Sequence, residues 1–301
     1  MKKVCVLLST YNGNDYFTEQ IESLISQKNI DIHISIRDDG SNEQFKSILA
    51  NTHKKYEDII DIDYGENVGF ASSFYKLVLN SHDDFDFYAF SDQDDVWLPD
   101  KISKCVDKIE NSDVPQLCFC NSFITDSNLV IKQKCYEHNL IVSNKCFNLF
   151  RNPAQGCSMV FNKEAKRLFL QGNPKFIEYH DHWLYVICSF LGKIYYIDEP
   201  LFYYRQHGNN QVGVASSLSQ NIKHKKSMLK KETHYIQKAS SMMIDLFSDR
   251  LSHEELDYLS VVCNYRKSFR NKIRLLRNKE IKKYLKPVRR WFIIRVLFNK
   301  V

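Results

Sequence analysis

Apolar runs of strand length alternate with helically spaced apolar residues over the first part of the chain. Residues 4–8 form an unbroken apolar run, which is typical of a strand covered on both faces of a parallel sheet. Further runs predict strands at 31–37, 59–64 and 85–90, and apolar stripes predict helices at 16–27, 43–56 and 70–80. This alternation predicts an α/β fold, with a mostly parallel Rossmann-like sheet and helices on both faces.

Three of the predicted strands end in polar loops. The loops contain, in chain order, Thr10, Tyr11 and Asn12; Asp38, Asp39, Gly40 and Ser41; and Asp92, Gln93, Asp94 and Asp95. In open α/β sheets, ligands bind beyond the carboxyl ends of the strands. We therefore expect the three loops to line one crevice and to form the active site.

The third of these loops packs three carboxylates into four residues. On an extended backbone, Asp92 and Asp94 point to the same face. Carboxylates this close repel each other unless a positive group lies between them. Mg²⁺ and Mn²⁺ are hard cations that take oxygen ligands and often bind a substrate phosphate as well. The alternative is a solvated acidic turn that closes the strand.

Two common phosphate-binding motifs are missing. No G-x-G-x-x-G follows the first strand and no G-x-x-x-x-G-K-[ST] occurs anywhere, which disfavours a dinucleotide dehydrogenase and a P-loop NTPase. A nucleotide could bind by other means, with Asp39 accepting a hydrogen bond from a base imide and Gly69 letting the backbone approach the ligand closely. Alternatively, one of Asp38 and Asp39 caps the loop and the other is solvated.

A second candidate feature lies in the following part of the chain. Helices are predicted at 99–110 and 164–170, and strands at 117–125, 193–197 and 201–204. Asp181 directly precedes the apolar segment 184–191, between His180 and His182. A carboxylate at a helix N-terminus meets the positive end of the helix dipole, which favours its ionised form.

Charge is distributed unevenly along the chain. The net charge is +6, but its two parts differ in sign. Residues 1–222 form an acidic body with 21 Lys and Arg against 29 Asp and Glu. Residues 223–301 form a basic tail with 21 Lys and Arg against 7 Asp and Glu. Such a tail suggests a polyanionic partner, either nucleic acid or an anionic membrane surface. Nine scattered cysteines without a C-x-x-C pair fit a reducing cytosol. No apolar segment approaches the ~18–20 residues that span a bilayer, and the run at 4–8 lacks a signal-peptide cleavage site.

The tail is predicted to be a helical extension, residues 216–301, that follows a body of residues 1–215. Helical patterns cover 223–238, 240–247 and 256–286, and an aromatic apolar run at 291–298 closes the chain. A basic amphipathic helix with such an end fits a helix that lies on a membrane surface. The alternative is an extension packed on the body with its Lys and Arg solvated. A nucleic-acid-binding tail would leave the crevice carboxylates unexplained, and no base-stacking module is recognisable.

Six motifs occur in the order found in the family-2 glycosyltransferases. They are VLLSTYN at 6–12, RDDGS at 37–41, NVGF at 67–70, SDQDDVW at 91–97, GCSM at 156–159 and HDHW at 180–183. The chain resembles this family over residues 1–210. SDQDDVW together with YRQHGNN at 204–210 looks most like the branch of rhamnosyltransferases.

The resemblance implies a glycosyltransferase A fold and an inverting sugar transfer from a dTDP- or UDP-sugar with the help of Mn²⁺ or Mg²⁺. The sugar would be rhamnose, or alternatively another hexose or N-acetylhexosamine. The acceptor would be a hydroxyl of a growing cell-surface polysaccharide or lipid-linked glycan, and the enzyme would be cytoplasmic, at the inner face of a bacterial membrane.

The same resemblance assigns roles to residues. Donor-binding residues would be Thr10, Tyr11, Asn12, Asp39, Gly69, Asp92, Gln93 and Asp94. The metal would contact Asp94 and His207, and Asp181 would be the general base. The sugar or acceptor pocket would contain Trp97, Gly156, Cys157, His180 and Trp183. The family often has Glu at the position of His180.

Sugar transfer needs a general base at the acceptor and a positive charge at the diphosphate. An acceptor hydroxyl needs a base within hydrogen-bond reach, and the departing diphosphate needs positive charge. A metal-dependent nucleotidyltransferase, the alternative from another enzyme class, would share the acidic cluster but would not need a carboxylate at the position of Asp181.

Overall fold

The computed structural model describes residues 1–137, 140, 142–207, 234–284 and 289–300. These residues divide into two compact units. The sheet unit contains residues 1–143 and 152–207, and the helical unit contains residues 144–151 and 208–301. The predicted boundary at 215/216 lies outside the described residues, as does most of the helix predicted at 223–238.

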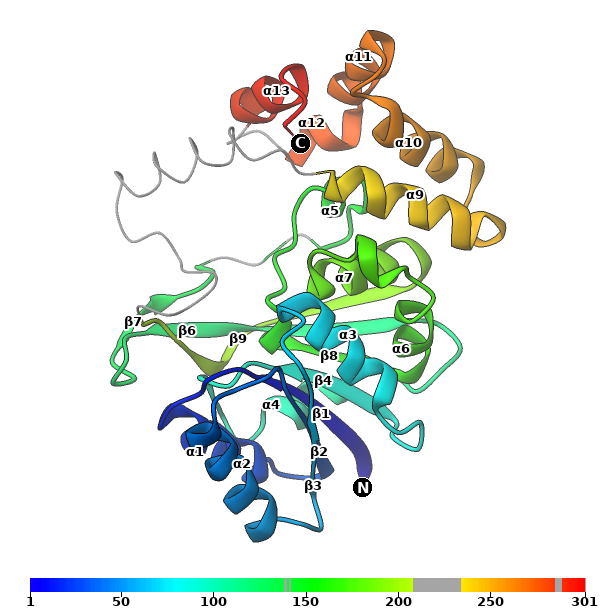
Figure 1. Ribbon diagram of the computed structural model, residues 1–301. Coiled ribbons are helices and arrows are strands. Elements are labelled where there is room, and N and C mark those ends of the chain that lie inside the picture. The colour runs from blue at the N-terminus through cyan, green and yellow to red at the C-terminus, as the bar shows by residue number, and fades with distance from the viewer. Residues whose placement is uncertain (138–139, 141, 208–233, 285–288, 301) are drawn as a thin grey trace. The chain divides into compact units, whose positions relative to one another are not determined.

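The first four long strands form the parallel part of the sheet (Figure 1). In chain order, the elements are β1 (Lys2–Thr10), α1 (Tyr16–Ile25), β2 (Ile30–Asp38), α2 (Glu43–Lys55), β3 (Ile60–Tyr64), α3 (Phe70–Asn80) and β4 (Phe87–Ser91). The strands lie side by side in the order β3-β2-β1-β4, and each pair of neighbours is parallel. The predicted alternation of strands and helices is therefore confirmed in this region.

Beyond β4 the sheet is mixed. The remaining strands are β5 (Val96–Trp97), β6 (Gln116–Thr125), β7 (Ile131–Lys134), β8 (Met159–Asn162) and β9 (Lys193–Arg205). Strand β8 runs antiparallel to both β4 and β6, whereas β9 runs parallel to β6 and antiparallel to β5. The fold is thus of the predicted α/β class, with an all-parallel order as far as β4 and a mixture of parallel and antiparallel pairs beyond it.

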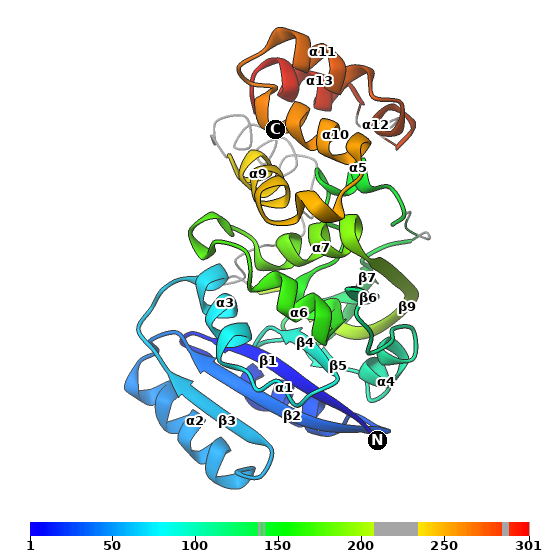
Figure 2. The same cartoon turned by 90° about the vertical axis from the view of Figure 1, so that its right-hand side faces the viewer.

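Helices cover both faces of the sheet (Figures 1 and 2). Val4, Val6 and Leu8 of β1 pack in one core with α1, α2 and α4 (Lys101–Val106), which cover one face. The other face is covered by α3, α6 (Lys163–Phe169) and α7 (His180–Leu191). Because β1 and β4 are covered on both sides, residues 4–8 and 87–91 are buried without interruption. This burial explains their unbroken apolar pattern.

The helical unit consists of short helices instead of the predicted continuous helix at 256–286. They are α5 (Lys145–Asn148), α9 (Tyr235–Phe247), α10 (His253–Asn264), α11 (Phe269–Arg277), α12 (Lys279–Tyr284) and α13 (Arg289–Leu297). The break before α11 has a local cause, because the Ser268 side chain accepts a hydrogen bond from the backbone N–H of Asn271 and so caps a new helix.

A sequence-distant segment completes the helical unit. Residues 144–151 lie between β7 and β8 in the chain, yet they belong to this unit. The hydroxyl of Tyr258 donates to the carbonyl of Cys146 at 2.7 Å, and Lys145 pairs with Glu255 at 2.7 Å. Within the described parts of the chain, no helix is both long enough and apolar enough to cross a membrane.

Candidate active site

The loops that follow β1, β2 and β4 are tied together by hydrogen bonds. The Gln93 side chain accepts from the backbone N–H of Tyr11 at 3.0 Å and donates to its carbonyl at 3.2 Å. The backbone N–H of Asn12 donates to the Ser41 hydroxyl at 2.8 Å, and the Asn12 side chain accepts from the N–H of Asn42 at 2.9 Å. The structure therefore brings the three polar loops to one edge of the sheet, with the Tyr11 side chain exposed there.

Asp38 and Asp39 serve different purposes. Asp38 is buried, accepting from the Thr10 hydroxyl at 3.2 Å and from the backbone N–H of Ser41 at 3.0 Å, so it caps the loop. Asp39 pairs with Arg37 at 2.5 Å and accepts from the N–H groups of residues 68 and 69, each at 2.9 Å. The Thr10 hydroxyl is thus held in the interior, and Asp39 is held rigidly by its neighbours.

Gly69 is the residue that allows this arrangement. It precedes α3 with φ +84° and ψ 159°, a conformation that glycine adopts far more readily than other residues. In that conformation its N–H reaches Oδ2 of Asp39. The NVGF segment is therefore hydrogen-bonded to the loop that follows β2.

The acidic loop after β4 contains an Asp–His pair. Oδ2 of Asp94 lies 2.8 Å from Nε2 of His207, which follows the end of β9. The His207 ring also packs against Tyr16 of α1, with the ring centroids 5.2 Å apart. Residues from three distant parts of the chain thus meet at Asp94.

Arg205 contacts the backbone of the acidic loop and holds it in place. Its guanidinium donates to the carbonyl of Asp94 at 2.9 Å, pairs with Glu19 of α1 and lies 4.1 Å from the Tyr16 ring centroid. Its backbone N–H donates to Oδ1 of Asp95 at 3.3 Å. Sequence reasoning noted Arg205 only as part of YRQHGNN, and Glu19 and Tyr16 were missed because nothing in a helical stripe indicates what its polar face contacts.

A second group of possible ligands lies on the inner side of the loop. Side-chain atoms of Asp92, Asp95 and Cys157 all lie within 4.8 Å of one another. Burial and the nearby Asp94 raise the pKa of Asp92 to about 7 and raise that of Asp95 well above its usual range. Oδ2 of Asp95 is buried and has no hydrogen-bond partner among the described residues.

These carboxylates fit a hard divalent cation. A cation would satisfy the unpartnered oxygen and relieve the repulsion that raises the pKa values. Burial also raises the pKa of the Cys157 thiol, and a protonated thiol is a poor ligand for Mg²⁺ or Mn²⁺. The oxygens of the acidic loop, with His207 beside Asp94, are therefore the groups suited to hold such an ion.

Asp181 is positioned by two hydrogen bonds at the start of α7. Its Oδ1 accepts from the backbone N–H of His182 at 2.7 Å, and its Oδ2 accepts from the Asn152 amide at 3.0 Å. The Asn152 oxygen in turn accepts from the N–H of Ala154 at 3.1 Å, which orients the amide. Burial raises the pKa of Asp181 to about 6. Asn152 carried no signal in the sequence, because an Asn before Pro is an ordinary loop residue.

Gly156 and Cys157 connect Asp181 with the acidic loop. A Cβ at Gly156 would lie 3.7 Å from that of Asp181 and 2.9 Å from Nε2 of His180, so only glycine fits without displacement. The next residue, Cys157, contacts Asp92 and Asp95. Asp181 and the acidic loop therefore both lie next to one short segment, and Asp181 is close enough to raise the pKa of Asp92 further.

Three aromatic candidates for the sugar or acceptor pocket are buried. The His180 ring stacks on Phe74 at 3.9 Å, and burial lowers its pKa to about 3, which keeps it neutral. The Trp183 indole donates to the carbonyl of Phe169 at 3.2 Å, and Trp97 is covered by the Lys101 ammonium, 3.0 Å from its ring centroid. All three side chains are at most 2% exposed, so they form the core beneath the site.

The architecture is that of known nucleotide-sugar enzymes. The chain superposes on Staphylococcus aureus TarS in complex with UDP-GlcNAc, with a TM-score of 0.56 and 13% identity, covering 100% of this chain and 90% of that one. It also superposes on GalNAc-T7 with UDP, GalNAc and Mn²⁺, with a TM-score of 0.54 and 12% identity, covering 99% and 57% of the two chains. These likenesses show a glycosyltransferase A fold.

Sequence comparison defines the family. The model of glycosyl transferase family 2 matches residues 5–170, and the chain belongs to that family. A dTDP-rhamnosyl transferase, RfbG of Shigella flexneri, is 31% identical over 263 residues, covering 83% of this chain and 88% of the relative. An uncharacterized glycosyltransferase of Nostoc is 27% identical over 233 residues, covering 72% and 69%. The predicted family is therefore confirmed.

Proposed function

We propose that this protein is an inverting, metal-dependent glycosyltransferase that moves a sugar from a dTDP- or UDP-sugar to an acceptor hydroxyl. The observation that carries the proposal is that Asp181 and the acidic loop both lie next to residues 156–157. Asp181 would face the acceptor, and the carboxylates of the acidic loop would face the diphosphate. Such a pair suits a single displacement at the anomeric carbon, without a covalent sugar–enzyme intermediate.

The acidic loop would hold the donor diphosphate. Asp94 and His207 would ligate Mn²⁺ or Mg²⁺, and Asp92 would lie near the ribose. When bound, the cation neutralises charge that develops on the departing diphosphate. The loop of Tyr11 and Asn12, tied to Gln93, would form one wall of the base pocket, and Asp39 with Gly69 would form the other.

Asp181 would act as the general base. Its pKa of about 6 lies near neutral pH, where a base is both ionised and able to take up a proton. The two hydrogen bonds from residues 152 and 182 leave lone pairs on both carboxylate oxygens. One of these would accept the proton of the acceptor hydroxyl as the new glycosidic bond forms and the diphosphate leaves.

The relatives favour one donor sugar over others. The similarity to a dTDP-rhamnosyl transferase favours dTDP-rhamnose, and another hexose or N-acetylhexosamine is the second candidate. We propose that the acceptor belongs to a growing cell-surface polysaccharide or lipid-linked glycan. The enzyme would then work in the cytoplasm at the inner face of a bacterial membrane.

Donor turnover tests the proposal. Purified protein is incubated with dTDP-rhamnose, UDP-glucose or UDP-GlcNAc, with Mn²⁺ or with EDTA, and the released nucleotide is measured. We expect Mn²⁺-dependent release of a nucleoside diphosphate from one donor. Without an acceptor, water takes its place, and the donor is slowly hydrolysed to the free sugar and the nucleoside diphosphate. Release of a sugar phosphate, with the nucleoside monophosphate transferred or freed, would instead identify a nucleotidyltransferase. No release from any donor under either condition would contradict the assignment.

A further inference from the structure

In the described part of the helical unit, positive charge is concentrated towards the end of the chain. From Tyr265 to Val301 the chain contains 14 Lys and Arg and a single carboxylate, that of Glu280. Residues 234–264, which form α9 and α10, contain only two Lys and Arg and five Asp and Glu. Among the described residues of the helical unit, the positive charge is therefore concentrated in the segment that contains α11–α13.

The same helices expose apolar side chains. Among the described residues of the helical unit, the large apolar side chains that are exposed are Phe269, Ile294, Leu297 and Phe298, at 70, 40, 46 and 69%. They come from α11 and from α13 with the residue after it. These two helices pack together, and the Lys272 ammonium donates to the carbonyl of Leu297 at 3.0 Å. Single exposed apolar residues are ordinary, but a group on adjoining helices marks an interaction surface.

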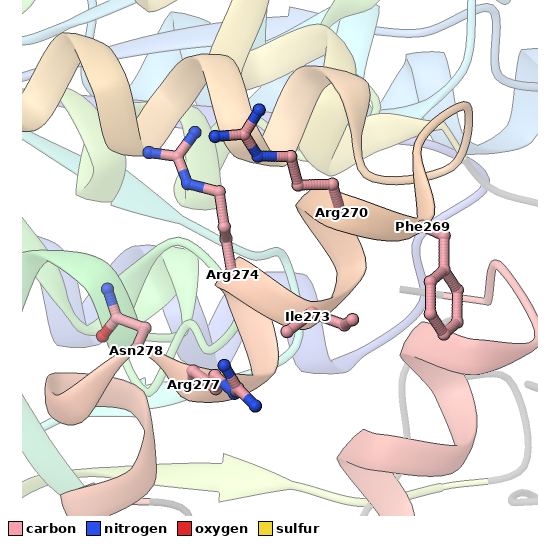
Figure 3. Close-up of a pocket in the computed structure, with 6 residues that line it drawn as sticks. All are labelled: Phe269, Arg270, Ile273, Arg274, Arg277 and Asn278. Carbon is pink, nitrogen blue, oxygen red and sulfur yellow. The ribbon is translucent and has the colours of Figure 1, made fainter.

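A hollow along α11 combines both properties (Figure 3). It has a volume of about 580 Å³ and is lined by Phe269, Arg270, Ile273, Arg274, Arg277 and Asn278. Arg270, Arg274 and Arg277 are exposed and spaced four and three residues apart, so they share one side of the helix. Phe269 points toward α13.

Two of the three arginines lack a counter-charge among the described residues. Arg274 pairs with Asp257 of α10 at 2.5 Å. Arg270 and Arg277 form no ion pair with any residue that the structure describes. A guanidinium is a planar fork that binds phosphate oxygens through two parallel hydrogen bonds. The hollow therefore fits a phosphate group that has an apolar neighbour.

We propose that α11 and α13 lie on an anionic phospholipid surface. Arg270 and Arg277 bind lipid phosphates, and Phe269, Leu297 and Phe298 enter the boundary between headgroups and acyl chains. This geometry is that of an amphipathic helix lying in the interface plane. The aliphatic residues favour lipid over nucleic acid, because Ile294 and Leu297 gain from an apolar phase but offer no ring on which a base could stack.

This inference deepens the proposed function, because a membrane-bound acceptor would lie at the same surface, but it is tested without measuring sugar transfer. The full-length protein is sedimented with vesicles of phosphatidylcholine alone and of phosphatidylcholine mixed with an equal amount of phosphatidylglycerol. We expect binding to the anionic vesicles only, and we expect it to disappear in high salt, which shortens the screening length from about 10 Å at 0.1 M to about 3 Å at 1 M.

Two variants separate the charge from the apolar contacts. Replacing Arg270 and Arg277 with Gln should weaken binding to anionic vesicles about 25-fold, at about fivefold for each basic residue near the surface. Replacing Phe269 and Phe298 with Ser should also weaken it, and circular dichroism verifies that both variants remain folded. The matched control is Lys28→Gln with Lys54→Gln, which removes two exposed positive charges from the sheet unit and should leave binding unchanged.

Several results would overturn the inference. Equal binding to both kinds of vesicle would contradict the proposed contacts of Arg270 and Arg277 with lipid phosphates. An arginine variant that binds like the control would contradict them as well. Loss of vesicle binding in millimolar inorganic phosphate at constant ionic strength would identify a site for free phosphate instead. An arginine variant that loses RNA binding but keeps vesicle binding would identify a nucleic-acid surface. Failure of the proposed function would appear separately, as no nucleotide release in the donor assay.

Discussion

Replacing Asp181 with Asn removes the proposed base at nearly constant size. In the native protein the two carboxylate oxygens accept separate hydrogen bonds, at 2.7 Å from the N–H of His182 and at 3.0 Å from the Asn152 amide. An Asn side chain has one oxygen, so its NH₂ group must face one of these donors. The Asn152 amide cannot turn over to accept without losing its own bond from Ala154 at 3.1 Å.

The expected effect falls on the chemical step. Loss of a positioned general base lowers kcat by about 10²–10⁴, equivalent to about 3–5 kcal/mol of activation free energy. Donor affinity should change little, because the acidic loop belongs to other elements. We would measure kcat from the release of nucleoside diphosphate in the presence of acceptor, and donor Kd by calorimetry with Mn²⁺.

The pH profile provides an independent readout. Burial raises the pKa of Asp181 to about 6, and the base is active only when it is ionised. Wild-type kcat should therefore rise with pH through about 6 and then level off, since the carboxyl is protonated below its pKa and ionised above it. Asp181→Asn should have no such rise.

Retention of the wild-type kcat and of the acid limb by Asp181→Asn would refute this reasoning and remove Asp181 from the mechanism. The matched control is Asp31→Asn, which changes an exposed carboxylate at the amino end of β2, opposite the edge where the loops meet. It should keep both kcat and the pH profile. A variant that loses donor affinity as strongly as kcat would show that Asp181 acts in binding.

Three further predictions concern the groups around the base and the acidic loop. Asp94→Asn or His207→Ala should abolish the gain in donor affinity that Mn²⁺ provides in calorimetry, and an unchanged gain would exclude both as ligands. Asn152→Ala removes a hydrogen bond that stabilises the carboxylate, so the pKa of Asp181 should rise and the acid limb of the kcat profile should move to higher pH. Rescue by Asn152→Gln would support a positioning role for Asn152. An acid limb that does not move would argue against that role. Gly69→Ala places a Cβ in a backbone conformation that costs about 1–3 kcal/mol, so urea denaturation should show a lower unfolding free energy, and unchanged stability would contradict the strain argument.

The sheet and the edge where its loops meet could be predicted because they depend on local patterns. Unbroken apolar runs identify strands covered on both faces, and β1 and β4 are buried throughout as that pattern requires. The rule that ligands bind beyond the carboxyl ends of parallel strands then places Tyr11, Asp39 and Asp94 at one edge. No long-range contact had to be known for either step.

Other features depend on contacts that no local pattern encodes. Residues 144–151 belong to the helical unit because Lys145 and Cys146 contact α10, more than a hundred positions away along the chain. His180 and Trp183 look like pocket residues in a motif, but burial against Phe74 and Phe169 makes them core residues. The long helix predicted at 256–286 is interrupted before α11, where Ser268 caps a new helix, and again at Asn278, where the backbone leaves the helical conformation. An apolar stripe reveals neither interruption.

The contacts of Arg205 explain how the acidic loop can be both rigid and strongly charged. A buried guanidinium beside three carboxylates would neutralise them if it paired with them directly. Instead its charge is paired with Glu19, while its contact with the loop is to the backbone carbonyl of Asp94 at 2.9 Å. The loop is therefore held in position by a cation that leaves its carboxylates available. Burial and the repulsion from Asp94 raise the pKa values of Asp92 and Asp95, and both effects would favour a bound cation at this loop.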